Sequence, residues 1–156
     1  YMEDYSDFDR LTITLLENRI SSFKDISNQQ KLDSFQKRLV KKGVSKIYVV
    51  KHENDFLYVG TTVQSLTARF RYGLNANGKK GYHGYKWKHK ESVDLFVWCF
   101  ESLDKIQIES IEAELAFIIR STTGKWPLNQ NEIHFNNQFE DGREIAQKMF
   151  DHIEKL

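Results

Sequence analysis

The chain has 156 residues, of which 40% are hydrophobic and 29% are charged, and its formal net charge is +1. This length and balance predict one compact domain whose core is large enough to fold without disulfide bridges or a structural metal. No apolar run approaches the roughly 18 residues that a membrane-spanning helix needs, so we expect no association with a membrane.

Charge is unevenly distributed along the chain. Residues 66–90 contain seven Lys or Arg and no Asp or Glu, whereas residues 101–156 contain eleven acidic and six basic side chains. A basic segment on a nearly neutral protein can bind a polyanion, although solvated loop lysines give the same pattern. The one cysteine, Cys99, lies in an apolar run and indicates a reducing compartment, from which we expect a cytoplasmic protein.

Apolar residues in the stretch 7–42 recur at helical spacing, which predicts two amphipathic helices that break near Ser27. Their apolar faces consist of Leu11, Leu15, Leu16, Ile20 and Phe23 in the first and Leu32, Phe35 and Leu39 in the second. We interpret residues 1–43 as an N-terminal helical extension that packs on the rest of the domain. The alternative is that these helices bind a partner protein.

Two short runs rich in β-branched and aromatic residues follow this extension. Residues 46–51 and 56–60 flank the polar segment 52–55, a pattern typical of a β-hairpin. A helix should follow the hairpin, because Thr62 or Ser65 can cap it and Leu66 and Phe70 are spaced one turn apart. Residues 73–90 are rich in Gly and Lys and predict a long basic loop.

The second half of the chain completes the predicted fold. Residues 93–100 are apolar on both faces of a strand pattern, which predicts the central strand of a sheet covered on both sides. Amphipathic helices are predicted over 106–120 and 141–154. We therefore expect an α/β or α+β fold with a small, mainly antiparallel, three-stranded sheet flanked by helices. The main domain would span 44–135, and 136–156 would form a C-terminal helix packed on it.

The most specific pattern is an ordered set of residues on the hairpin and the helices that follow it. Ile47-Tyr48-Val49 lies on the first hairpin strand and Tyr58-Val59-Gly60 on the second, so both phenols can reach the same face of the sheet. Arg69 follows nine residues after Gly60. The helix after the third strand carries several carboxylates, and Pro127-Leu128-Asn129 comes soon after it.

This ordered set resembles the GIY-YIG nuclease family over roughly residues 46–130. The resemblance implies that the catalytic residues are Tyr48, Tyr58, Arg69, Glu114 and Asn129. It also implies that Glu114 binds one Mg²⁺ or Mn²⁺ ion. Lys46 stands where the family has its first motif glycine, and no loop residue aligns with the His or Lys that many members carry shortly after the arginine.

Helical geometry distinguishes the carboxylates that are available for the metal. Glu114 lies beside the apolar stripe, three residues after Ile111 and four before Ile118, where a carboxylate is costly unless it is paired or binds a metal. Glu109 points away from the stripe, and Glu112 is the second candidate. We expect Glu114 to be the metal ligand, and an ion pair with a Lys or Arg is the alternative.

The resemblance implies a divalent-metal-dependent endonuclease that hydrolyses phosphodiester bonds in DNA, with RNA left open as a substrate. Arg69 is expected to contact the scissile phosphate. Tyr48 is expected to deprotonate the attacking water, a role that requires cationic neighbours because the pKa of a free tyrosine is about 10. Tyr58 would position the water or Tyr48. The alternative is a non-catalytic nucleic-acid-binding module on the same fold, motivated by Lys46 and by the lack of a loop histidine that aligns with the family.

The basic loop is the predicted contact with the nucleic acid. Its candidate phosphate ligands are Arg71, Lys79, Lys80, Lys86 and Lys88. The aromatic residues of this loop, Tyr82, Tyr85 and Trp87, can stack on bases or anchor the loop to the core.

Overall fold

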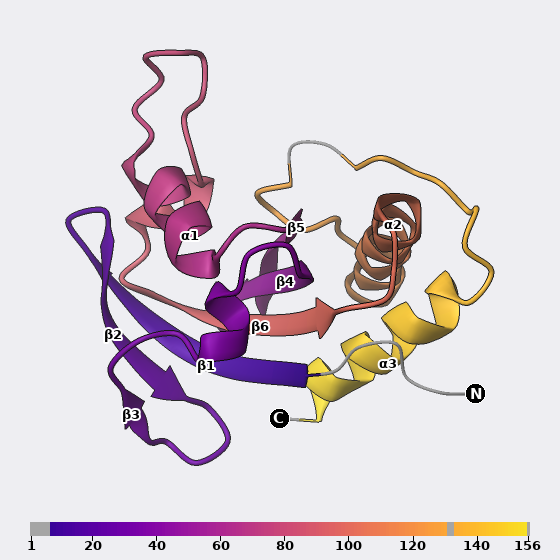
Figure 1. The fold of residues 1–156 in the computed structure, drawn as a ribbon, viewed down its shortest axis with the longest axis horizontal. Helices are drawn as coiled ribbons and strands as arrows, with labels where there is room; N and C mark the ends of the chain where they lie inside the picture. Colours follow the sequence, from indigo (N-terminus) through magenta and orange to yellow (C-terminus); the bar gives the residue numbers. More distant parts are fainter. Residues whose placement is uncertain (1–6, 131–132, 156) are drawn as a thin grey trace.

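The computed structural model describes residues 7–130 and 133–155, which form one sheet with helices on both of its faces (Figure 1). The strands are β1 (Asp7–Leu16), β2 (Arg19–Asp25), β3 (Lys31–Leu32), β4 (Ser45–His52), β5 (Asp55–Thr62) and β6 (Ser92–Phe100). The helices are α1 (Leu66–Asn75), α2 (Lys105–Thr123) and α3 (Gly142–Glu154), with short 3₁₀ turns η1 (Lys37–Val40) and η2 (Lys86–His89). None of the helices in these ranges combines the length and the apolar character needed to cross a membrane.

The sheet is twice as wide as the sequence pattern predicted. In the described ranges it has six strands in the order β3-β2-β1-β6-β4-β5, and each neighbouring pair is antiparallel. The expectation of a three-stranded sheet was therefore wrong, while the general α+β class is confirmed. β4, β5, β6 and the helices α1, α2 and α3 lie where the sequence predicted them.

The additional strands come from the N-terminal region, so the predicted helical extension was wrong. Leu11, Ile13 and Leu15 alternate along β1 with threonines and are buried, which is the period of a strand with one covered face. Glu17 and Asn18 turn the chain into β2 with φ values of 52° and 62°. β1 then pairs with β6 along most of its length. This region is an integral half of the sheet.

The sheet separates two hydrophobic cores. α2 and α3 cover one face, where they pack on side chains such as Ile47, Val59 and Trp98. α1, η1 and η2 cover the other face, which includes Leu11 and Val50. β6 contributes buried residues to both cores, as expected for a central strand.

The outer edge of β5 pairs with the segment that follows α2. The N–H groups of Leu128 and Asn129 donate to the carbonyls of Phe56 and Leu57 at 2.9 and 2.7 Å. The side-chain amide of Gln130 bonds both the N–H and the C=O of Val59. These bonds hold Asn129 beside the hairpin.

Lys46, the residue in place of the motif glycine, is fully buried. Its Nζ donates to the carbonyls of Lys41, Val44 and Gln64 at distances between 2.8 and 3.0 Å. Burial lowers the pKa of this ammonium group, but all three of its donors have acceptors. Lys46 therefore joins the entry of β4 to the loop that leads into α1.

The N-terminal strand should contribute to global stability if it belongs to the sheet. Leu11→Ala is expected to lower the free energy of unfolding by about 3 kcal/mol, because Leu11 has no exposed surface. Leu16→Ala is the matched control on the same strand: its side chain is 55% exposed, and the expected change is below about 0.5 kcal/mol. Urea unfolding of both variants measures the difference, and equal effects would contradict the placement of β1.

Candidate active site

The pairing of β4 with β5 brings two tyrosines to one face of the sheet. Tyr48 lies opposite Gly60 and Val50 lies opposite Tyr58, and Leu57 is the extra residue of a β-bulge next to this pair. The ring centroids of Tyr48 and Tyr58 are 6.0 Å apart. A Cβ at Gly60 would lie 2.6 Å from an atom of each ring, so only glycine allows the two rings to meet over this position.

α1 places Arg69 above the tyrosines. Its Nη1 donates to the hydroxyl of Tyr82 at 3.0 Å, and its Cζ lies 4.8 Å from the centroid of the Tyr85 ring. Burial alone would lower the pKa of Arg69, but the phenol oxygens of Tyr48 and Tyr85 hold that pKa above its ordinary value. The guanidinium is therefore a permanent cation at this position.

These groups enclose a small cavity of about 50 Å³. It is lined by Tyr58, Arg69, Tyr82, Gly84, Tyr85, Lys86, Trp87 and Asn129. Two of these side chains are cationic and none is a carboxylate, so the cavity attracts an anion. The structure thus brings together Tyr58, Arg69 and Asn129, which were predicted as catalytic residues. Lys86, which was predicted as a phosphate ligand of the loop, joins them.

Tyr48 lies behind this cavity and does not line it. It is 1% exposed, and its hydroxyl is 3.0 Å from the hydroxyl of Tyr85. Burial raises the pKa of Tyr48 well above the usual value; Tyr85 and Tyr58 raise it further, while Arg69 opposes them with a smaller effect. The condition for a basic Tyr48, a phenolate favoured by cations, is therefore not met in this arrangement.

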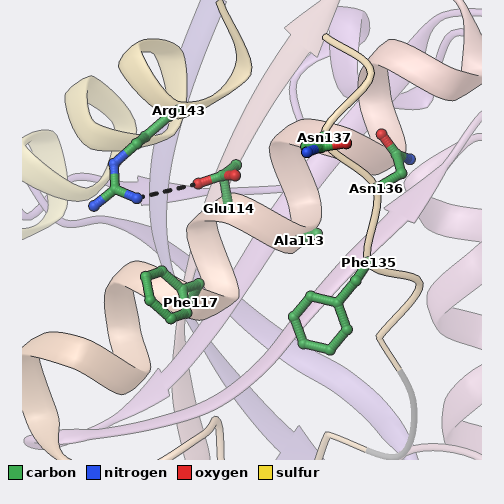
Figure 2. Close-up of a pocket in the computed structure, with 7 residues that line it drawn as sticks. All are labelled: Ala113, Glu114, Phe117, Phe135, Asn136, Asn137 and Arg143. Carbon is green, nitrogen blue, oxygen red and sulfur yellow. Dashed lines mark ion pairs between the residues drawn. The ribbon is translucent and has the colours of Figure 1, made fainter. Parts of the chain in front are cut away.

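The carboxylates of Glu112 and Glu114 project from opposite flanks of α2. Glu114 faces α3, where its Oε2 lies 3.8 Å from Nη1 of Arg143 (Figure 2). With Phe117 and Phe135 it lines a separate cavity of about 450 Å³. The structure therefore does not bring Glu114 to the tyrosines. Its ion pair with Arg143 corresponds to the alternative to metal binding that the sequence left open.

Glu112 projects from the flank of α2 that faces β5. Its charge raises the pKa of Tyr58, on which burial has the largest effect and Arg69 acts in the opposite direction. Burial and the nearby Glu109 raise the pKa of Glu112 to about 7. Within residues 7–130 and 133–155, no hydrogen bond or ion pair engages its carboxylate.

A divalent cation fits Glu112 better than Glu114. A partly buried carboxylate without a counter-charge is costly, and a cation beside it removes that cost. The buried Oε2 of Glu114 has no hydrogen-bond partner among the described residues, but Glu114 does have a counter-charge in Arg143 at 3.8 Å. The described residues contain no group of three or more His, Cys, Asp or Glu side chains that could hold a metal. A cation at Glu112 would therefore take most of its ligands from water and a bound phosphate.

The basic residues near the site fall into different environments. Residues 76–85 form an arm that extends from α1 away from the sheet (Figure 1). Lys79 and Lys80 lie at its tip, in the turn closed by the bond from the Gly81 N–H to the Gly78 carbonyl, and both side chains are exposed. Nζ of Lys88 donates to the carbonyls of Ala76 and His83, so Lys88 closes the base of the arm. Arg71 lines a different hollow, between α1 and β2.

Two of the loop aromatics anchor the arm to the core. Tyr85 and Trp87 are 4% and 1% exposed, and their rings stack with centroids 4.5 Å apart. Tyr82 is half-buried and stacks on Tyr72 of α1. One signal in the sequence indicates that the arm packs on α1. Gly73 lies inside α1, one turn after Arg69, and a Cβ at this position would lie 2.1 Å from the Tyr85 ring.

Comparison with protein families supports a relationship for the part of the chain that builds this site. A family model described as GIY-YIG catalytic domain matches residues 44–127. Searches of the curated proteins and of the solved structures found no significant match. The matched region contains both tyrosines, Arg69 and the carboxylates of α2, while β1, β2 and β3 precede it.

The raised pKa of Glu112 should make stability depend on pH. Its pKa of about 7 in the folded protein lies above the ordinary value of 4.5, so the free energy of unfolding should fall as pH rises from about 4.5 to 7 and then level off. Without divalent metal, Glu112→Gln should remove this fall and be more stable than the wild type at pH 8, by up to about 3 kcal/mol.

Denaturant unfolding at pH 4 and pH 8 measures this effect. Glu101→Gln, at an exposed position, controls for the loss of one carboxylate. Identical pH dependence in the wild type and Glu112→Gln would show that the carboxylate is not held in a buried, uncompensated environment.

Proposed function

Because the chain belongs to the GIY-YIG catalytic domain family, we propose that it is a divalent-metal-dependent endonuclease that hydrolyses phosphodiester bonds in DNA. The observation that carries this proposal is the cationic cavity in which Arg69 and Lys86 lie beside three phenols and Asn129. Such a cavity suits the scissile phosphate of a nucleic acid.

Arg69 is the proposed phosphate ligand. Its guanidinium stays charged, and its contacts with Tyr82 and Tyr85 fix its orientation before any substrate binds. A fixed cation stabilises the additional negative charge that the phosphate oxygens carry in the transition state, without reorganising when that charge develops. Lys86 adds a second positive charge at the rim. Asn129, held to β5 by its backbone, can orient a phosphate oxygen or a water.

Glu112 is the proposed metal ligand in place of Glu114. Its carboxylate has no cation partner among the described residues, and it acts on Tyr58 across the edge of the sheet. A bound Mg²⁺ or Mn²⁺ would supply Lewis acidity at the phosphate and at the leaving oxygen. The protein's part is to hold the carboxylate and Arg69 on two sides of one phosphate.

The arm is the proposed contact with the rest of the nucleic acid. Lys79 and Lys80 are exposed at its tip and are available for phosphates. Lys88 is engaged with two carbonyls, so we assign it to the structure of the arm. Arg71 lines a different hollow, on the β2 side of α1, so we assign it no phosphate contact at the cavity.

The alternative of a non-catalytic binding module was motivated by Lys46. The ammonium group of this lysine is bonded to three carbonyls, and Lys46 does not line the cavity. The replacement of the motif glycine therefore leaves the cavity groups in place, which favours the catalytic proposal.

A cleavage assay on plasmid DNA with Mg²⁺ or Mn²⁺ tests the catalytic proposal and the choice of carboxylate. Arg69→Ala and Glu112→Gln are each expected to lower the cleavage rate by at least about 100-fold. Glu114→Gln is the matched control two residues away and should cut at nearly the wild-type rate. An inactive wild type that still binds DNA would instead support the binding module.

Metal binding can be measured separately from cleavage. At about ten times its dissociation constant, Mn²⁺ is expected to stabilise the wild type and Glu114→Gln by about 1.4 kcal/mol, or about 4 °C in the melting temperature. Glu112→Gln should show no such shift. A shift that is lost in Glu114→Gln and retained in Glu112→Gln would reverse the assignment.

DNA binding should depend on the tip of the arm. The double variant Lys79→Ala/Lys80→Ala is expected to weaken DNA binding and to reduce the slope of log K against log salt by about 2, because each phosphate contact contributes about 0.9. Lys24→Ala/Lys31→Ala removes the same charge from an exposed cross-strand pair on β2 and β3 and is the control. Equal effects of the two double variants would exclude a specific role for the arm.

A further inference from the structure

Tyr85 is held in place at the cavity by backbone and ring contacts. Its N–H donates to the carbonyl of Gly73 at 3.0 Å, and its ring occupies the space where a side chain at Gly73 would lie. Trp87 stacks on the ring, and Phe70 meets it edge to face at 5.5 Å between centroids. These contacts hold the Tyr85 ring in one position against Gly73, which lies one helical turn after Arg69 on α1.

The hydroxyls of Tyr85 and Tyr48 form a buried pair with unequal access to the cavity. They are 3.0 Å apart, and Tyr85 lines the cavity whereas Tyr48 does not. In the described part of the chain, Tyr85 is the hydrogen-bond partner of the Tyr48 hydroxyl. If Tyr48 donates to Tyr85, both hydroxyls are satisfied and the proton of Tyr85 remains available to a group in the cavity.

The electrostatic setting favours a donor rather than a base at this position. Burial raises the pKa of both phenols, so both stay protonated at neutral pH. The guanidinium of Arg69 lies over the Tyr85 ring and draws an anion into reach of its hydroxyl. A neutral phenol beside a bound anion donates a hydrogen bond to it.

We propose that Tyr85 is a catalytic residue whose hydroxyl donates a hydrogen bond to a non-bridging oxygen of the scissile phosphate, and that Tyr48 positions this hydroxyl from behind. The proposal rests on the proposed nuclease function and changes the part of Tyr48 from a base to a positioning residue. The hydrogen bond strengthens as negative charge accumulates on the phosphate oxygens, so it acts mainly on kcat.

Single-turnover and steady-state cleavage of a DNA substrate by conservative variants tests this proposal. Tyr85→Phe is expected to lower kcat by about 100-fold with KM changed by less than about 3-fold. Tyr48→Phe should lower kcat less, by about 10-fold, because the donor remains but loses its orientation. The double variant should match Tyr85→Phe alone, since Tyr48 acts through Tyr85. Tyr72→Phe, at an exposed tyrosine of α1, should keep the wild-type kcat.

The outcomes separate this proposal from the proposed function. A wild type without nuclease activity removes both, whereas an active wild type with Tyr85→Phe within 3-fold of its kcat overturns the role of Tyr85 alone. Additive effects of the two variants overturn the positioning role of Tyr48. If Tyr85→Phe fails to fold, as judged by tryptophan fluorescence and thermal melting, the variant Gly73→Ala decides. That change favours the helix but displaces the Tyr85 ring, and a kcat within 3-fold of the wild type then overturns the proposal.

Discussion

The close contact of two tyrosine rings over Gly60 is the constraint on which the site depends. It requires the register that sets Tyr48 opposite Gly60, the bulge that keeps Tyr58 on the same face, and the absence of a side chain between them. With the rings in this position, Tyr48 reaches Phe70 of α1 and the hydroxyl of Tyr85. The orientation of α1, and with it that of Arg69, follows from this packing.

The site is built around the edge of the sheet and not on one face. Phenols and cations gather on the side covered by α1, while Glu112 approaches from the flank of α2 on the other side. Among the described residues, no ion pair joins Glu112 to the cations of the cavity. Under the proposed function, a phosphate would accept hydrogen bonds from the phenols and cations, and Glu112 would hold the accompanying metal ion.

The sequence predicted the local elements of this site better than their tertiary arrangement. The hairpin, α1 and the common face of the two tyrosines followed from alternation and spacing, whereas the role of the tyrosines in the site came from the family resemblance. The β1–β2 hairpin was missed because Leu11, Leu15 and Leu16 fit a helical period as well as Leu11, Ile13 and Leu15 fit a strand, and the turn at Glu17 has no glycine to mark it. The choice between Glu112 and Glu114 depends on which flank of α2 faces β5. Helical spacing alone does not give this orientation of α2 relative to the sheet.

The two ends of the arm are in backbone contact, so the length of the arm can change without a change in the shape of the cavity. Gly84 packs so closely on the carbonyl of Gly73 that a Cβ there would lie 2.1 Å from the oxygen, whereas Gly81 at the tip has open space around it. Insertions or deletions near Gly81 can thus lengthen or shorten the arm while Tyr85 keeps its place. Under the proposed function, the span of nucleic acid that the arm contacts is then free to diverge in evolution, whereas the arrangement of side chains beside Arg69 is not.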